Sequence, residues 1–115
     1  MASWFESKMS DFNRMKEVIE GIIGLPVANI RVEKVSNTRF IFVTVNANAS
    51  TVLRKWLEVA DKLKGTNIVL EWSGETDVEP EELGKLLGMI FAKQDIYLTG
   101  DEHFDAVKLL EEEWR

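Results

Sequence analysis

The sequence predicts a single α/β domain, a sandwich in which helices pack on one mixed four-stranded sheet. Its 115 residues suffice for one domain and leave no room for a second core. Hydrophobic residues make up 45% of the chain and charged residues 30%, as in ordinary globular proteins. After a first hairpin, apolar runs alternate with amphipathic stretches, which indicates parallel strands joined by crossover helices. We therefore expect one domain over residues 1–115 with the element order α-β-β-α-β-α-β-α.

A leading amphipathic helix is expected within residues 1–24. Ser3 and Glu6 fit a capping box at its start, although Ser10 would begin a shorter helix. Gly24, followed by Pro26, is a typical helix end. The stripe that recurs at steps of three and four consists of Phe5, Met9, Phe12, Met15 or Lys16, Ile19 and Ile22/Ile23.

Two strands are expected next, at residues 30–35 and 39–45. The first alternates loosely between apolar and charged residues, as a strand exposed on one side does. The second is almost entirely β-branched or aromatic, which is typical of a strand covered on both faces. Residues 36–38 suit a turn, so the pair should form an antiparallel hairpin.

A second helix and a third strand should follow the hairpin. Apolar residues at helical spacing mark the helix from Val52 to Leu63, with Asn48 or Ser50 as its cap and an end near Gly65. The compact apolar run at residues 67–72 then predicts a buried strand.

The remaining chain predicts one more helix, one more strand and a last helix. Leu83 to Ile90 mark the third helix, and Pro80 suits its first turn because the missing N–H costs nothing there. Residues 96–98 read as a short strand, and residues 99–102 offer a capping box for the closing helix. The apolar positions of that helix are Phe104, Val107, Leu110 and Trp114.

Charge is distributed unevenly along the chain. The net charge of −6 repels phosphate backbones and argues against nucleic-acid binding. Residues 1–70 carry ten Lys/Arg and seven Asp/Glu, whereas residues 71–115 carry four and thirteen. Six of those acids lie between Glu71 and Glu82 without an intervening base. Acids favour the first turns of helices, which explains part of this excess and leaves a purely solvated edge as the alternative interpretation.

The acids fall in strand-to-helix connections, which emerge at one edge of a parallel sheet. We expect them to converge there into an acidic rim, next to residues 46–48, and to bind a basic surface of another protein. The expected rim residues are Glu75, Asp77, Glu79, Glu81, Glu82, Asp101 and Glu102. Such charges chiefly speed association and select the partner.

Other chemistry has little support in the sequence. His103, the single histidine, lies among acids and could in principle be a metal ligand or general base, but no second motif fixes a geometry. There is no cysteine, no glycine spacing that cradles phosphate and no nucleophile with a base. We therefore predict no enzyme activity, no cofactor and no metal.

The leading helix is a second candidate surface. Trp4, Phe5, Met9 and Phe12 give it a wide aromatic and methionine face, which suits adaptable protein contacts. This face either covers one side of the sheet or binds another protein, including a second copy of the chain. The alternative function is accordingly a small self-associating accessory, immunity or inhibitor protein that uses this helix.

The sequence also predicts the compartment. Glu6 interrupts the N-terminal region, which lacks the apolar core of a secretory signal. No stretch approaches the roughly 20 consecutive apolar residues of a membrane helix. We expect a cytoplasmic protein that does not bind membranes.

From residue 29 to about 113, the chain resembles a divergent STAS domain, the fold of the bacterial anti-sigma-factor antagonists. Residues 67–72 are similar to that family's strand of the type IVLDL, and residues 96–100 and a closing helix follow in the same order. The core would then span residues 29–115, with 1–24 as an added helix. The resemblance implies a regulatory, protein-binding role.

The phosphorylation signature of that family is altered here. Where the family has Asp-Ser-Ser-Gly-Leu-Gly, this chain reads Glu79-Pro80-Glu81-Glu82-Leu83-Gly84. Both serines are replaced, by Pro80 and Glu81, so the resemblance implies a copy that phosphorylation cannot switch at this place. A carboxylate at a helix start mimics part of the charge of a phosphate.

Overall fold

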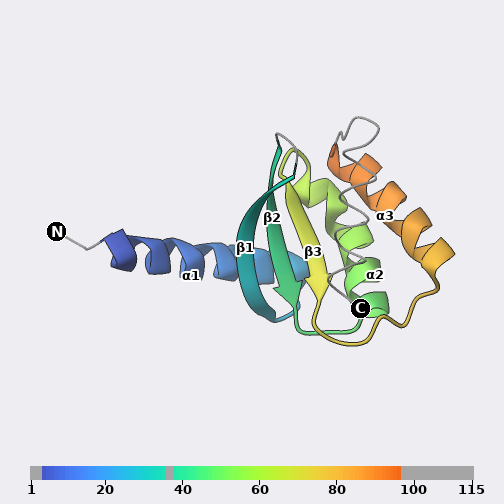
Figure 1. The fold of residues 1–115 in the computed structure, drawn as a ribbon, viewed down its shortest axis with the longest axis horizontal. Helices are drawn as coiled ribbons and strands as arrows, with labels where there is room; N and C mark the ends of the chain where they lie inside the picture. Colours follow the sequence, from blue (N-terminus) through green and yellow to red (C-terminus); the bar gives the residue numbers. More distant parts are fainter. Residues whose placement is uncertain (1–3, 36–37, 97–115) are drawn as a thin grey trace.

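The computed structural model describes residues 4–35 and 38–96. Over these residues the chain forms three α-helices, one short 3-10 helix and three strands, in the order α-β-β-α-β-α. The strands lie side by side in the order β1-β2-β3. Figure 1 shows α2 and α3 stacked beside the sheet, while α1 passes behind the strands and projects beyond β1. The α/β class and the order of its first six elements are therefore as predicted.

Helix α1 (Trp4–Ile23) contains 20 residues, and its C-terminal turns enter the core. Ile19 and Ile23 are 2% and 0% exposed, because they lie on the apolar stripe that the sequence predicts. Gly24 ends the helix with a φ of 69°, a left-handed conformation that glycine adopts without a steric penalty. Its N–H donates to the carbonyl of Glu20 at 2.8 Å.

Strands β1 (Val27–Val35) and β2 (Thr38–Val45) form the predicted antiparallel hairpin. The aromatic side chains of Phe40 and Phe42 are almost fully buried on one face of the sheet, and Val43 and Val45 are buried on the other. Burial on both faces explains why β2 contains so few polar residues.

Helix α2 (Ala49–Val59) and the 3-10 helix η1 (Ala60–Leu63) lead from β2 to β3 (Ile68–Trp72). All five residues of β3 are buried, and β3 runs parallel to β2, with Val45 opposite Trp72. The two strands therefore end at the same edge of the sheet, as the sequence predicts for strands joined by a crossover.

Helix α3 (Pro80–Gln94) packs on α2 and η1. Pro80 is its first residue, where the absent N–H leaves no hydrogen bond unmade. At the other end, Gln94 is fully buried and donates from Nε2 to the carbonyl of Ile68 at 2.7 Å. Its Oε1 accepts a hydrogen bond from Nε1 of Trp56 at 2.8 Å. Gln94 thus joins α2, β3 and α3.

The prediction of a four-stranded sheet is wrong, because the sheet of the described residues has three strands. Ile96, expected to begin the fourth strand, instead caps α3. Its N–H donates to the carbonyl of Phe91 at 3.0 Å, and Asp95 before it adopts the left-handed conformation with φ 58°. Ile96 is 7% exposed and belongs to the hydrophobic core, but it is in none of the three strands of the described sheet. Residues 97–98 and the predicted closing helix lie outside the described residues.

Candidate functional site

Two loops meet at the edge where β2 and β3 end. Residues 46–48 follow β2, and residues 73–79 follow β3. The N–H of Gly74 donates to the carbonyl of Ala47 at 3.0 Å, and the N–H of Glu75 donates to Oδ1 of Asn48 at the same distance. The N–H of Ala49 donates in return to the carbonyl of Glu75 at 2.9 Å. The convergence expected for these two connections is therefore present, and it is held by hydrogen bonds in both directions.

Gly74 is required for this close approach. A Cβ atom at this position would lie 2.1 Å from Oδ1 of Asn48 and 2.9 Å from the carbonyl oxygen of Ala47. Since one of these neighbours is backbone, the contact leaves no space for any side chain. The loop after β3 can bond to the loop after β2 only because residue 74 is a glycine.

Helix α2 is capped by a residue from the other loop. Asn48 occupies the N-cap position but makes no side-chain bond to its own helix, since its Oδ1 bonds to Glu75. The carboxylate of Asp77 takes over this role. It accepts hydrogen bonds from the N–H of Ser50 at 2.9 Å and from Oγ of Ser50 at 2.6 Å. The prediction of Asn48 or Ser50 as the cap is confirmed for the N-cap position, which Asn48 occupies. The side-chain acceptor is instead Asp77, 27 residues after Ser50.

These hydrogen bonds also lower the pKa of the Asp77 carboxyl. The hydrogen bond from the Ser50 hydroxyl lowers the pKa of the Asp77 carboxyl below its usual value, and the bond from the Ser50 N–H lowers it further. The positive charge of Arg54 makes a smaller contribution in the same direction. Asp77 is therefore held as a carboxylate at the start of α2.

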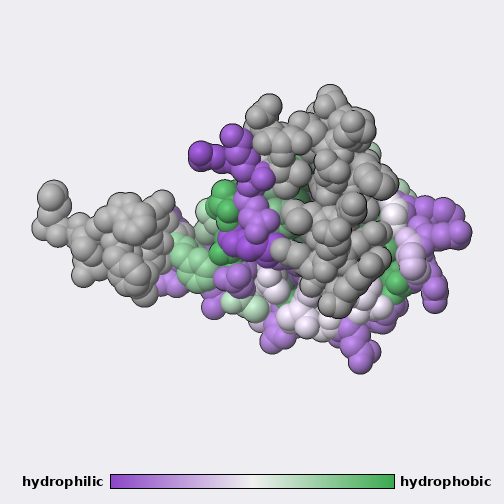
Figure 2. All heavy atoms as spheres, in the orientation of Figure 1, coloured by the Kyte–Doolittle hydropathy of each residue, from purple (hydrophilic) through white to green (hydrophobic). Residues whose placement is uncertain are grey.

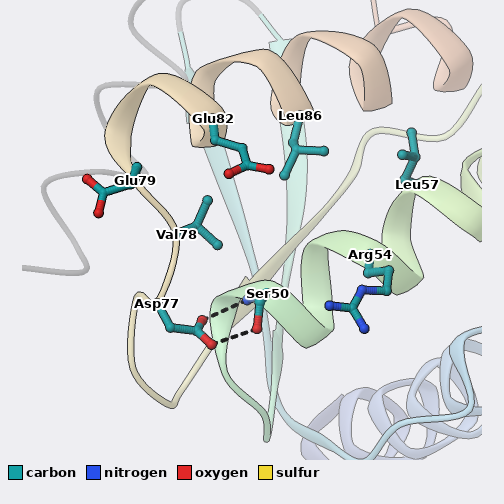
Figure 3. Close-up of a pocket in the computed structure, with 8 residues that line it drawn as sticks. All are labelled: Ser50, Arg54, Leu57, Asp77, Val78, Glu79, Glu82 and Leu86. Atoms are coloured by element: carbon teal, nitrogen blue, oxygen red, sulfur yellow. Dashed lines mark hydrogen bonds between the residues drawn. The ribbon is translucent and has the colours of Figure 1, made fainter.

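A cleft of about 340 Å³ opens between the starts of α2 and α3. Figure 3 shows Glu82 pointing into the space between the two helices and Glu79 at the entrance to α3. Val78 lies between Asp77 and these two acids, and Leu86 continues the wall along α3. The residues that line the cleft are Ser50, Arg54, Leu57, Asp77, Val78, Glu79, Glu82 and Leu86. Negative charge thus borders a partly apolar hollow.

The structure brings together some of the predicted rim and separates the rest. Asp77, Glu79 and Glu82 line the cleft, while Glu75 is exposed in the joined loops and Glu81 is exposed in the first turn of α3. Asp101 and Glu102 lie outside the described residues, as does His103. The rim is therefore described over residues 75–82.

Glu71 belongs to a different environment from the other acids. It is 2% exposed in β3, where Thr44 donates to its Oε1 at 3.0 Å. The guanidinium of Arg31 in β1 forms two hydrogen bonds with the same carboxylate. Glu71 therefore contributes to the sheet rather than to the acidic surface.

The sequence interpretation missed the cation and the apolar wall of the cleft. Arg54 and Leu57 follow Ser50 at four and seven residues, so helical spacing alone places all three on one face of α2. That signal was present in the sequence. What was not visible was that Val78 and Leu86 come to lie opposite this face.

The second candidate surface is described in part. Trp4, Phe5 and Met9 lie in α1, but their side chains are outside the described residues. Phe12 is 36% exposed, and the next turns of the helix enter the core. The helix therefore covers the sheet with its C-terminal part and leaves its N-terminal part beyond the domain (Figure 1).

Among the described residues, no group of three or more His, Cys, Asp or Glu side chains is arranged to hold a metal ion. No helix in that part of the chain has the length and apolar character needed to cross a membrane. Comparisons with protein-family models, with curated proteins and with solved structures found no match to this chain.

Proposed function

We propose that this chain is a non-enzymatic protein-binding module whose cleft between α2 and α3 receives a basic side chain of a partner protein. The observation that carries the proposal is the combination of carboxylates and apolar wall in one cleft. Val78, Leu57 and Leu86 suit the aliphatic stem of a lysine or arginine. Glu79 and Glu82 suit its charged head.

The cleft is held in shape before a partner arrives. The bonds between the two loops and the cap from Asp77 to Ser50 tie the start of α2 to the residues that precede α3. A preformed arrangement reduces the conformational entropy that binding would otherwise cost. Arg54, which has no ion-pair partner within the described part of the chain, would meet an acid of the partner and so help to set its orientation.

A basic peptide provides a direct test. We expect tri-arginine to shift the backbone NMR signals of Ser50, Asp77 and Glu82 at low salt, and the shifts to weaken as salt increases. The E79K/E82K double variant should abolish these shifts. The E58K/D61K variant changes the net charge equally, at exposed acids that do not line the cleft, and should keep them.

Binding of a natural partner protein, captured from the host, should depend on the same acids as the binding of tri-arginine. Reversal of Glu79, Glu81 and Glu82 to lysine should slow its association severalfold and flatten the salt dependence, since surface charges act mainly on the association rate. If both double variants respond to tri-arginine like the unmodified chain, the acids are a solvated edge and the proposal fails.

The regulatory role implied by the STAS resemblance is part of this proposal. Pro80 and Glu81 stand at the start of α3, where that family has serines, so binding would not be switched by phosphorylation there. We propose that this function belongs to the cytoplasm, which suits a chain whose stability does not depend on disulfide bonds.

A second candidate function is self-association, or inhibition of another protein, through α1. The observation that favours it is the projection of this helix beyond the domain (Figure 1). Apolar residues on a projecting helix are typical of a contact surface. Sedimentation of the full chain and of the chain without residues 1–11 tests this candidate, since only the full chain should self-associate.

A further inference from the structure

The N-terminal half of α1 projects beyond the sheet and the other described helices (Figure 1). The molecule measures 50 × 29 × 28 Å, and the projecting helix runs along its longest direction (Figure 1). A free helical segment of fewer than about 12 residues is only marginally stable in water. In the sequence, Phe5, Met9 and Phe12 continue, at steps of three and four residues, the apolar pattern to which Ile19 and Ile23 belong. The apolar pattern therefore extends further toward the N-terminus than the part of α1 that packs in the core.

Exposed apolar side chains gather where α1 leaves the domain. Val18 is 57% exposed and Val32 of β1 is 60% exposed, in addition to Phe12. Figure 2 shows hydrophobic atoms at the base of the projecting helix. Val32 lies opposite Ile41 in the hairpin, so both side chains are on the same face of the sheet. Exposed apolar side chains are therefore present on both α1 and β1.

A groove of about 520 Å³ lies beside the same helix. One wall is α1 from Arg14 to Ile22, and the opposite wall is formed by η1 and Thr66. Its apolar lining residues are Met15, Val18, Ile19, Ile22, Ile41, Leu63 and Ile68. The wall on α1 extends over nine residues, which equals the length of the segment from Trp4 to Phe12.

The groove carries one cation on each wall. These are Arg14 on α1 and Lys62 on η1, and neither has an ion-pair partner within the described part of the chain. The segment 4–12 carries two acids, Glu6 and Asp11, and one base. By helical spacing, the two acids flank the apolar stripe on opposite sides. The charges of this segment are therefore complementary to those of the groove.

We propose that two copies of the chain form a two-fold dimer in which residues 4–12 of each copy occupy the groove of the other. The two α1 helices run antiparallel, so that residues 4–12 of one lie beside residues 14–22 of the second. When the segment of one copy lies in the groove of the other, its apolar residues are covered. The two-fold axis produces the same contact a second time, with the two copies exchanged. This proposal rests on the second candidate function and does not involve the acidic cleft.

Sedimentation equilibrium gives the first test. We expect the full chain to sediment as a dimer, with twice the monomer mass of 13.2 kDa. The M9D and V18D variants, one in the segment and one in the groove, should each raise the dissociation constant at least about tenfold. M89D on α3 alters another exposed apolar residue, which is 54% exposed and outside the groove, and should leave the dimer unchanged.

A charge exchange tests the groove without introducing polar groups into the apolar contact. The E6K/D11K variant and the R14E/K62E variant should each associate at least about tenfold more weakly than the unmodified chain. Mixed in equal amounts, they should form a heterodimer, because both of its grooves then face a segment of opposite charge. Circular dichroism should show that the mixed dimer has the same helix content as the dimer of the unmodified chain. The E58K/D61K variant, as the control, should dimerise normally.

Three results would overturn the proposal. These are a monomer at millimolar concentration, a dimer that both charge variants leave unchanged, and a monomer whose groove binds dodecanoate instead. The E79K/E82K variant should dimerise normally, so loss of tri-arginine binding and loss of the dimer are separate outcomes. Failure of dimerisation therefore leaves the proposal for the cleft intact.

Discussion

Gln94 connects three elements through one buried amide. It accepts from Trp56 on α2 and donates to the carbonyl of Ile68 on β3, and no described buried side-chain polar atom lacks a hydrogen bond. The ring of Trp56 also packs edge-on against Phe91, with centroids 5.8 Å apart. The side chain in this position has to supply a donor and an acceptor together, and the amide of Gln94 supplies them from two different atoms, Nε2 and Oε1.

Replacement of Gln94 by leucine should lower the free energy of unfolding by about 2–4 kcal/mol. The substitution keeps the volume similar but leaves the Trp56 N–H and the Ile68 carbonyl without partners, and each unsatisfied buried group is costly. Urea denaturation of Q94L and of the exposed control K93L measures the difference. Equal stability of the two variants would contradict this role for the amide.

Asp77 makes the stability of the start of α2 depend on pH. Because its folded-state pKa is lowered, the stabilisation is fully present above the usual pKa of an aspartate and is lost as the pH falls through the lowered value. We expect a carboxyl-carbon NMR titration to place the pKa of Asp77 below that of an unfolded peptide. In S50A, which removes the hydroxyl donor, the pKa should move up toward the usual value. An unchanged titration in S50A would rule out the hydroxyl as the main cause.

At the scale of elements, the ion pair between β1 and β3 reaches across the hairpin to the parallel strand. Arg31 lies over the ring of Phe42 at 4.7 Å and also donates to Glu33 at 3.0 Å. Glu71 receives Arg31 from β1 and Thr44 from β2. One carboxylate therefore bonds to both other strands of the described sheet.

Replacement of Arg31 by methionine should destabilise the protein more than removal of both charges. R31M leaves Glu71 buried without its cation, which we expect to lower the free energy of unfolding by about 3 kcal/mol. R31M/E71L removes the uncompensated charge and should recover a large part of that loss. Thermal or urea unfolding of both variants measures this difference, and a double variant no more stable than R31M would contradict it.

At the scale of the whole molecule, α1 has two halves with different roles. Ile19 and Ile23 belong to the core, whereas residues 4–11 lie in the part of the helix that projects (Figure 1). We therefore expect the inner half to be required for folding and the projecting half to be dispensable.

Two deletions distinguish these halves. Deletion of residues 1–11 should give a folded monomer, because the two core isoleucines remain. Deletion of residues 1–24 removes both of them, and loss of each large buried side chain costs about 2–5 kcal/mol, so this variant should unfold. Circular dichroism and sedimentation of the two variants provide the measurement. An unfolded first variant would show that the projecting half is needed for the fold.

Local patterns were sufficient to predict most elements. The 3.6-residue stripe of α1, the glycine at residue 24, the β-branched run of β2 and Pro80 at the start of α3 are each encoded by near neighbours. The convergence of the loops after β2 and β3 also followed from the sequence, since parallel strands end at a common edge. For these features the physical cause acts within one element or follows from the direction of the chain.

The site itself depended on contacts between distant residues. Asp77 caps a helix 27 residues earlier, Glu71 leaves the acidic surface for a partner 40 residues away, and Ile96 ends a helix where an apolar run suggested a strand. The apolar wall of the cleft likewise appears only when α2 and α3 are packed together. Periodicity and propensity report the conformation of neighbouring residues, whereas the partner of a polar or apolar side chain is selected by packing of the whole chain.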